Sequence, residues 1–231
     1  MASAIARNLE AVRQRIASAA RRAGRDPEAV TLVGVSKTVP VERVREAIDA
    51  GLLDLGENRV QEAREKAPSL PAEVRWHLVG HLQSNKAAHA ARLFKVVHSV
   101  DSVEILGKLD QAASKEGRRI DALVQVDLAG EATKFGIEEG RIDEVLDAAA
   151  SCGSVAVRGL MNLPPYDPDP EKVRPYFRRL RRLLEEARAR HPGLALDRLS
   201  MGMTEDFEVA VEEGSTLVRV GRALFGERPR P

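Results

Sequence analysis

The sequence predicts an α/β fold, a TIM-like (β/α)8 barrel formed by a single domain over residues 1–231 with an extra N-terminal helix. From residue 30 onward, short β-branched apolar runs alternate with amphipathic helical stretches, as in successive strand–helix units of a parallel sheet. Eight such runs recur at intervals of about 26 residues, the length of a compact strand, loop, helix and loop. The first run leads into Gly34-Val35-Ser36-Lys37-Thr38, without the Gly-x-Gly-x-x-Gly turn typical of a doubly wound open sheet. The closed barrel is therefore the preferred architecture.

The N-terminal segment is expected to form a helix that packs on this barrel. Ile5, Leu9, Val12 and Ile16 recur at helical spacing and line one face. The segment is rich in arginine, as organelle transit peptides are, but no processing site or linker follows it. The eight expected strands follow in the order Thr31–Val35, Leu53–Leu55, Arg75–Val79, Val96–Val100, Ala122–Val126, Val155–Leu160, Arg198–Ser200 and Leu217–Val220.

Hydroxyl side chains mark several expected helix starts. Ser102 is expected to cap a helix that continues to Lys115, and Ser84 and Thr204 to cap two others. The longest expected helix covers Glu171–Arg190. Its arginine-rich face is interpreted as a solvated outer surface, because no aromatic side chains or wider basic field accompany it.

Composition excludes several classes of function. The 36 basic residues nearly balance 35 acidic ones, so no global field attracts nucleic acid or an anionic membrane. No apolar run approaches the roughly 18 residues that a membrane span needs. The single cysteine, Cys152, cannot form an internal disulfide, which favours a reducing cytoplasm.

Chemistry in such a barrel is expected where the strands end and the βα loops begin. Lys37 closes the first apolar run, and a desolvated amine there can act as a nucleophile. The alternative is a lysine at the barrel rim whose ammonium group reaches into solvent. Gly202 and Gly221 follow the seventh and eighth runs, where such barrels bind phosphate through backbone N–H groups. An amine opposite a phosphate site fits a phosphorylated aldehyde held as a Schiff base, and pyridoxal 5′-phosphate is the commonest cofactor of that kind.

Six ordered blocks make this inference more specific than any single short motif can. They lie between about residue 30 and Gly226, and they are Val35–Thr38, Gly56–Glu62, Trp76–Lys86, His98–Asp101, Arg158–Met161 and Leu199–Phe207. Together these blocks closely resemble the pyridoxal phosphate homeostasis protein family, which is similar to the barrel domain of bacterial alanine racemases. The resemblance implies the fold type III of pyridoxal-phosphate proteins.

The resemblance also implies the roles of individual residues. It makes Lys37 the Schiff-base lysine, places Asn58 beside the cofactor ring and directs Arg219 at the pyridine nitrogen. The remaining expected cofactor-binding residues are Ser200, Gly202 and Gly221 around the phosphate, together with Met201 and Arg222. Two positions depart from the family pattern. Arg222 stands where a threonine is frequent, and Arg59 replaces a common aromatic, which changes the packing expected around Asn58.

The implied function is vitamin B6 homeostasis, in which the protein carries or buffers pyridoxal 5′-phosphate without established turnover, so no enzyme activity is expected. Expected partners are the cofactor and apo-enzymes that receive it, with no nucleic acid and no membrane, and the protein is expected to be a cytoplasmic monomer. The main alternative is a pyridoxal-phosphate-dependent amino-acid racemase, which needs a second acid or base on the opposite face of the substrate. Only Tyr166 and Tyr176 are available for that role, and neither lies in a suitable segment.

Other readings of single residues are weaker. A Schiff-base aldolase would need a carboxylate beside Lys37, and the sequence suggests none. Lys134 is the main rival for the aldehyde, but its neighbours are polar. His77 and His81 are four residues apart in a strand and loop, so they do not share a helical face, and no metal site is expected.

Overall fold

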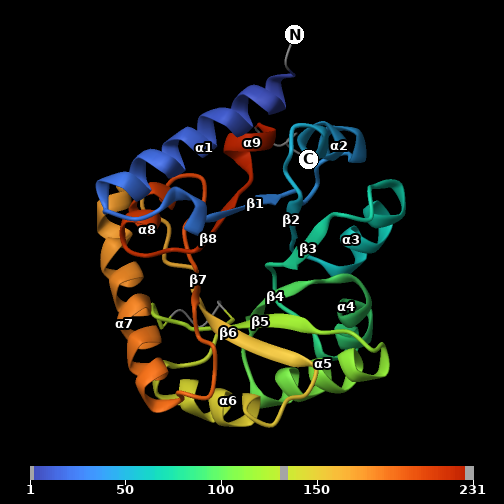
Figure 1. Cartoon of the computed structure of the whole chain (residues 1–231), viewed down its shortest axis with the longest axis vertical. Helices are drawn as coiled ribbons and strands as arrows, with labels where there is room; N and C mark the ends of the chain where they lie inside the picture. The colour runs from blue at the N-terminus through green and yellow to red at the C-terminus, as the bar shows by residue number, and fades with distance from the viewer. Residues whose placement is uncertain (1–2, 131–134, 227–231) are drawn as a thin grey trace.

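The computed structural model describes residues 3–130 and 135–226. Within these residues, eight parallel strands close into a barrel in chain order, and β8 pairs with β1 (Figure 1). The strands are β1 (Thr31–Val35), β2 (Asp54–Glu57), β3 (Arg75–Leu78), β4 (Val96–Val100), β5 (Ile120–Gln125), β6 (Val155–Met161), β7 (Arg198–Ser200) and β8 (Leu217–Val220). The predicted (β/α)8 barrel is confirmed.

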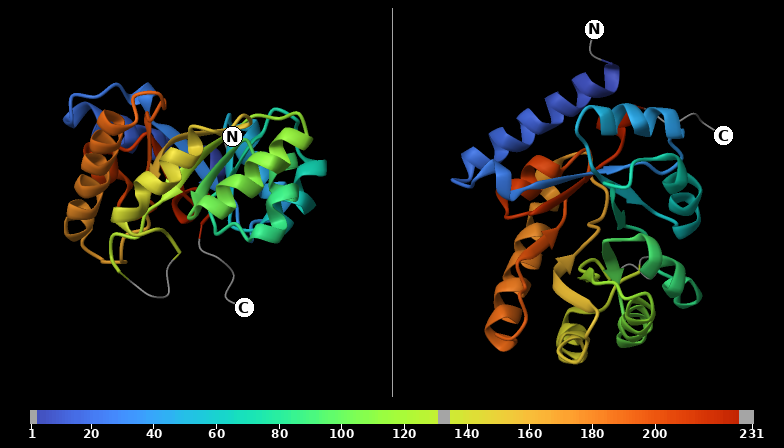
Figure 2. Two further views of the ribbon diagram at one scale, coloured as in Figure 1. Left: turned by 90° about the horizontal axis from the view of Figure 1, so that it is seen from below. Right: turned by 45° about the vertical axis from the view of Figure 1, so that its right-hand side comes forward.

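Helices surround the strands on the outside of the barrel (Figure 2). The α-helices are α1 (Ala4–Arg22), α2 (Val41–Asp49), α3 (Val60–Lys66), α4 (Ala87–Leu93), α5 (Val103–Lys115), α6 (Ile142–Ala149), α7 (Arg174–Arg190), α8 (Phe207–Glu212) and α9 (Arg222–Phe225). Short 3-10 turns are η1 (Pro27–Ala29), η2 (Ala67–Ser69), η3 (Ser84–Lys86), η4 (Glu139–Arg141) and η5 (Pro170–Val173). None of the helices in the described part of the chain is long and apolar enough to cross a membrane.

Strand side chains alternate between the helix layer and the barrel interior, as the two-residue period of a strand requires. Outward-facing residues such as Leu55 and Leu78 join the large hydrophobic core between strands and helices. The interior holds a separate, small apolar cluster of Val33, Leu123, Met161 and Leu217. The rest of the interior includes buried polar side chains, and these bear on the candidate site.

Helix α1 packs against α8 and α9, the last two helices of the described chain. Its apolar face, which includes Ile5 and Leu9, is buried as the sequence predicts. The helix crosses α8 and α9 (Figure 1). Asn8 Nδ2 donates to the carbonyl of Leu224 at 3.0 Å, and Arg15 forms a 3.1 Å ion pair with Glu208.

Three predicted helix starts have different outcomes. The Ser102 hydroxyl accepts a hydrogen bond from the N–H of Ile105 at 3.2 Å, so this cap is confirmed. The Ser84 prediction is wrong, because residue 84 opens η3 and α4 begins only at Ala87. The Thr204 prediction is also wrong. Helix α8 begins at Phe207 with Asp206 at its N-cap position, two residues later than predicted, and no side-chain hydrogen bond caps it.

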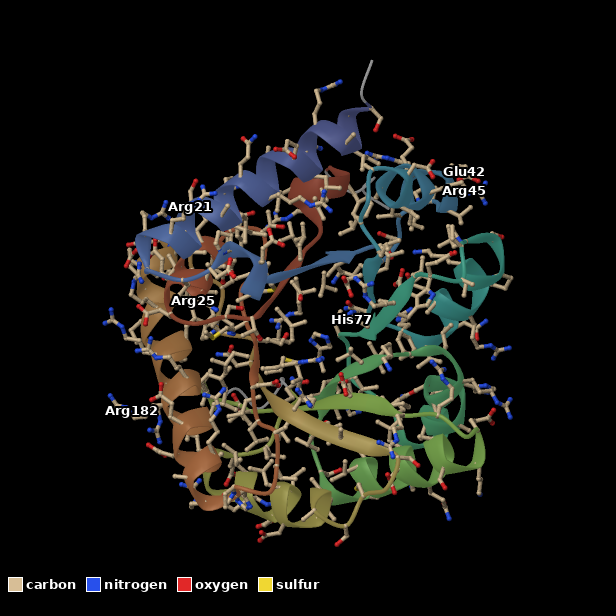
Figure 3. The ribbon with its side chains drawn as sticks, viewed as in Figure 1. Arg21, Arg25, Glu42, Arg45, His77 and Arg182 are labelled. Atoms are coloured by element: carbon tan, nitrogen blue, oxygen red, sulfur yellow. The ribbon has the colours of Figure 1, made fainter. Side chains whose placement is uncertain are left out.

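Helix α7 confirms the interpretation of its arginine-rich face. The helix starts at Arg174, after η5, rather than at residue 171 as predicted; Pro175, which has no N–H to donate, fits its first turn. Arg179 lies 3.6 Å from Glu186, and Arg181 lies 3.8 Å from Glu185. Arg182 points away from the barrel (Figure 3), so the arginines form a solvated outer surface.

Candidate functional site

The predicted cofactor-binding residues lie at the C-terminal ends of four neighbouring strands. These strands are β7, β8, β1 and β2, which are consecutive around the barrel because β8 pairs with β1. The residues are Lys37 after β1, Asn58 after β2, Ser200, Met201 and Gly202 at the end of β7, Arg219 within β8, and Gly221 and Arg222 after it. Barrel closure therefore brings together segments from both ends of the chain at one side of the mouth.

Lys37 lies half-buried in a strained turn. Thr38, which follows it, has a φ of 61°, a left-handed conformation that is unusual for a β-branched residue. The N–H of Thr38 donates to the Glu62 carboxylate at 3.1 Å, and this hydrogen bond helps to hold the turn. Backbone strain of this kind concentrates at functional positions.

A buried carboxylate adjoins the Lys37 turn, contrary to what the sequence suggested. Ser36 Oγ and Lys66 Nζ each donate to Glu57 Oε1 at 2.7 Å, and Lys66 Nζ also donates to the carbonyl of Ser36 at 2.6 Å. Burial raises the pKa of Glu57, although its hydrogen bonds with Lys66 and Ser36 oppose that rise. Sequence reasoning missed the carboxylate because residues 36 and 57 meet only through the pairing of β1 with β2.

Asn58 is positioned by a glycine rather than by Arg59. A Cβ atom on Gly80 would lie 2.3 Å from the carbonyl oxygen of Asn58, so the loop after β3 approaches Asn58 closely because residue 80 is glycine. Arg59 is exposed at the start of α3. Its departure from the family pattern leaves this contact intact.

The loops after β7 and β8 offer unused backbone donors. Among the described residues, the N–H groups of Gly202, Gly221 and Arg222 donate to no protein acceptor. Gly202 has a φ of 94°, and a Cβ there would lie 2.6 Å from Ala210 Cβ in α8. A substituted residue could therefore not follow this path. Free N–H groups in glycine loops at the start of a helix suit an anion such as a phosphate group.

Two arginines in this region have different surroundings. Arg219 is buried, and its guanidinium donates to Ser200 Oγ and, at 2.9 Å, to the carbonyl of Asn162. Burial lowers the pKa of Arg219 to about 10, which leaves it protonated at neutral pH. Arg222 is exposed at the surface, where it forms a 2.8 Å ion pair with Glu205. Its contribution to an anion site would come from the backbone N–H.

The Ser200 hydroxyl faces the barrel interior, where the sequence did not place it. Ser200 Oγ lies 2.8 Å from His98 Nδ1, and His98 Nε2 lies 2.9 Å from His77 Nδ1. His77 Nε2 lies 3.0 Å from Asp54 Oδ1. The sequence suggested a role for His77 only as a partner of His81. The polar position of His98 within the apolar run Val96–Val100 was the available signal.

Asn162 is a second residue that sequence analysis missed. It follows β6 and is 1% exposed, yet neither its side-chain oxygen nor its nitrogen has a hydrogen-bond partner in the described structure. A buried amide without partners costs about 1–3 kcal/mol, so a polar ligand group beside Arg219 would relieve that cost.

The remaining predictions concern metals and a rival lysine. No group of three or more metal-ligating side chains occurs within residues 3–130 and 135–226. His81 stacks on Phe135 with ring centroids 3.7 Å apart, and its Nδ1 lies 3.0 Å from Asp101 Oδ2. Lys134 lies outside the described residues.

Comparison with known proteins identifies close relatives. Residues 7–229 match the family described as the alanine racemase N-terminal domain. The chain is 44% identical over 221 residues to the pyridoxal phosphate homeostasis protein of Aquifex aeolicus, covering 95% of this chain and 96% of that protein. The solved structure of PipY from Synechococcus elongatus PCC7942 with pyridoxal phosphate bound has a TM-score of 0.85 and 37% identity, covering 96% of this chain and 100% of PipY.

A more distant match concerns the fold alone. The alanine racemase of Clostridium difficile 630 has a TM-score of 0.69 and 16% identity, covering 98% of this chain but 57% of the racemase. The close matches confirm the resemblance drawn from the six sequence blocks.

Proposed function

Because this chain belongs to the pyridoxal phosphate homeostasis protein family, we propose that it binds pyridoxal 5′-phosphate and acts in vitamin B6 homeostasis by carrying or buffering the cofactor. The proposal depends on the position of Lys37 after β1, next to the β8 and β7 loops that hold the free N–H groups of Gly202, Gly221 and Arg222. An amine and several unused N–H donors on one side of one barrel mouth would suit a phosphorylated aldehyde.

The donor set fits the parts of the cofactor. The Lys37 amine would attach covalently to the aldehyde, and the backbone N–H groups of the β7 and β8 loops would bind the phosphate. Arg219 has only donors, so it would face an unprotonated pyridine nitrogen. The unpartnered amide of Asn162 lies next to the carbonyl that Arg219 binds and offers a further polar contact. Asn58 would lie beside the ring, and Met201, directly after β7, is buried.

We infer that the chain has little or no amino-acid turnover. When bound to an amino acid, the cofactor can act as an electron sink, which is most effective with a protonated ring nitrogen. The charged Arg219 beside that nitrogen disfavours a second positive charge there. A racemase would also need an opposed acid or base. Tyr176 lies in the outer helix α7, and Tyr166 is 78% exposed in the loop after β6.

The test for turnover is proton exchange. Incubating the loaded protein with L-alanine and other amino acids in deuterated water should give no sustained exchange at the α-carbon. Steady Lys37-dependent exchange or D-amino-acid formation over many turnovers would restore the racemase alternative.

We also propose that the protein is a cytoplasmic monomer that passes the cofactor to apo-enzymes. The large exposed apolar side chains of the described residues support a docking role at the cofactor end. They all lie on loops or helix starts after β4, β5, β6 and β7, and they are Val103, Phe135, Tyr166 and Met203. Light scattering of the purified protein measures its oligomeric state, and cofactor transfer to an added apo-enzyme measures delivery.

The central experiment replaces the lysine. The Lys37→Ala variant should lose the visible absorption that the wild-type chain acquires with pyridoxal phosphate. Borohydride reduction of the loaded wild type, followed by peptide mapping, should place the label on Lys37. A Lys172→Ala variant at the exposed edge of η5 is the control and should behave as wild type. A Lys37→Ala variant that keeps full absorption, with label on Lys134 or Lys86, would show that another lysine holds the cofactor.

A further inference from the structure

A continuous chain of hydrogen bonds crosses the barrel interior from the candidate site to the opposite mouth. It starts at Arg219, passes through Ser200, His98 and His77, and ends at Asp54. At that end, Asp54 also accepts from Arg75 Nε at 2.8 Å. The five side chains come from β8, β7, β4, β3 and β2, so the chain exists only in the closed barrel.

The members of this chain are almost completely withdrawn from water. Ser200 and His98 have no exposed surface, His77 is 2% exposed and Arg219 is 4% exposed. Figure 3 shows His77 near the middle of the molecule, among the strands. Buried polar groups that lose a partner pay the full cost of desolvation, so each link depends on the next one.

Only one arrangement of hydrogen atoms satisfies the chain when both rings are neutral. Burial above all holds the pKa of His98 well below its ordinary value, and the charge of Arg219 adds to this effect, so His98 is neutral. Asp54 is ionised and can only accept, so His77 carries its hydrogen on Nε2 and accepts at Nδ1. His98 must then donate from Nε2 and accept at Nδ1.

The hydrogen-bonding partners of Ser200 determine the direction of its hydroxyl hydrogen in the same way. Arg219 can only donate, so Ser200 Oγ accepts from the guanidinium. Its own hydrogen then points to His98 Nδ1, the remaining acceptor. Every donor in the chain therefore points from Arg219 toward Asp54, and the Ser200 hydrogen is not available to a phosphate group.

We propose that His98 and His77 are positioning residues of the cofactor site, which orient Ser200 so that its oxygen fixes the Arg219 guanidinium against the pyridine nitrogen of pyridoxal phosphate. This inference rests on the proposed function. It assigns Ser200 to the support of Arg219, and it extends the site across the barrel to Asp54, on the face remote from the Lys37 turn.

The first test examines the chain in the cofactor-free protein. Nuclear magnetic resonance of isotope-labelled histidine rings should find His98 and His77 neutral and protonated on Nε2. A charged His77 would reverse the chain, so that His98 donated from Nδ1 to Ser200. Detection of the Nδ1-protonated form of His98 would overturn the assigned order.

The second test compares three variants. His98→Leu removes the acceptor for Ser200 and should weaken pyridoxal phosphate binding by about tenfold, the equivalent of one net hydrogen bond, while shifting the absorption maximum of the bound cofactor. His98→Asn keeps an acceptor near the Nδ1 position and should recover most of the affinity and the wild-type spectrum. His191→Asn is the control, because His191 pairs with Asp143 on the outer helices, and it should change neither quantity.

The outcomes separate this inference from the function on which it rests. If His98→Leu folds and binds with wild-type affinity and spectrum, the positioning role is refuted while the proposed function stands. If the wild-type chain itself fails to bind pyridoxal phosphate, both are refuted. Failure of His98→Asn to recover what His98→Leu loses would show that packing, rather than the hydrogen bond to Ser200, maintains the site.

Discussion

The contribution of Asp54 to stability can be measured, and it tests how the buried polar groups of the barrel interior interact. It is the first residue of β2, and its carboxylate accepts hydrogen bonds from His77 and Arg75. Burial alone would raise its pKa, but those two partners more than compensate and lower the pKa from 3.8 to about 2. The Asp54→Asn substitution keeps an oxygen acceptor at this position and removes the charge.

The size and pH range of the effect follow from this shift. A folded-state pKa of about 2 against 3.8 in the unfolded chain corresponds to about 2 kcal/mol of stability at neutral pH. Because the folded-state pKa is the lower one, this contribution is present above pH 4 and disappears as the pH falls. It should be about 2 kcal/mol above pH 4, about 1 kcal/mol at pH 3 and about 0.4 kcal/mol at pH 2.

The assay is urea denaturation of wild type and variant across this pH range. The difference in the free energy of unfolding should narrow as the pH falls from 4 toward 2. Asp49→Asn, at the exposed end of α2, is the control and should show a small difference without this narrowing. A difference that keeps its full size at pH 3, or that is absent at pH 7, would refute the account of Asp54.

Two other predictions concern the β7 loop and the anion site. Gly202→Ala should destabilise the fold by about 2–4 kcal/mol, because its φ of 94° is unfavourable and the added Cβ would meet α8. The control is Gly107→Ala in α5, where the added Cβ meets nothing within 4 Å. In thermal denaturation of both variants, Gly107→Ala should be neutral or stabilising. Pyridoxal without its phosphate should bind more weakly by a few kcal/mol in equilibrium titration, since several charge-assisted hydrogen bonds are lost. Equal affinity for the two compounds would show that the β7 and β8 loops do not bind the phosphate.

Local sequence patterns were sufficient to predict most of the fold. The strands Thr31–Val35, Val96–Val100 and Leu217–Val220 have the predicted ends, because their apolar runs stop at polar or glycine residues. The caps predicted at Ser84 and Thr204 failed because capping depends on the path of the loop. A hydroxyl in the sequence does not reveal whether the chain first makes a 3-10 turn, as at Ser84, or a turn that delays the helix to Phe207.

The candidate site also has one part that the sequence predicts and one part that it does not. Glycines and the lysine at strand ends could be predicted, because their position after an apolar run is a local property. The partners of Ser200 could not, since Ser200 and His98 are 102 residues apart in sequence. The carboxylate of Glu57 beside the Lys37 turn was missed for the same reason. Contacts across the barrel depend on closure, and no spacing within one segment encodes them.

The attachment of α1 to α8 and α9 has a consequence for how the protein is made. Arg15 and its partner Glu208 are 193 residues apart, and Arg25 donates to the carbonyls of Val211 and Ser215. During synthesis, α1 leaves the ribosome long before α8 and α9 are made, so its apolar face stays exposed until then. Contacts of such high sequence separation slow folding and leave the early segment open to wrong associations. The glycine loops after β7 and β8 are made in the same last stretch, so a nascent chain gains the loops proposed to bind phosphate and the contacts of its N-terminal helix together.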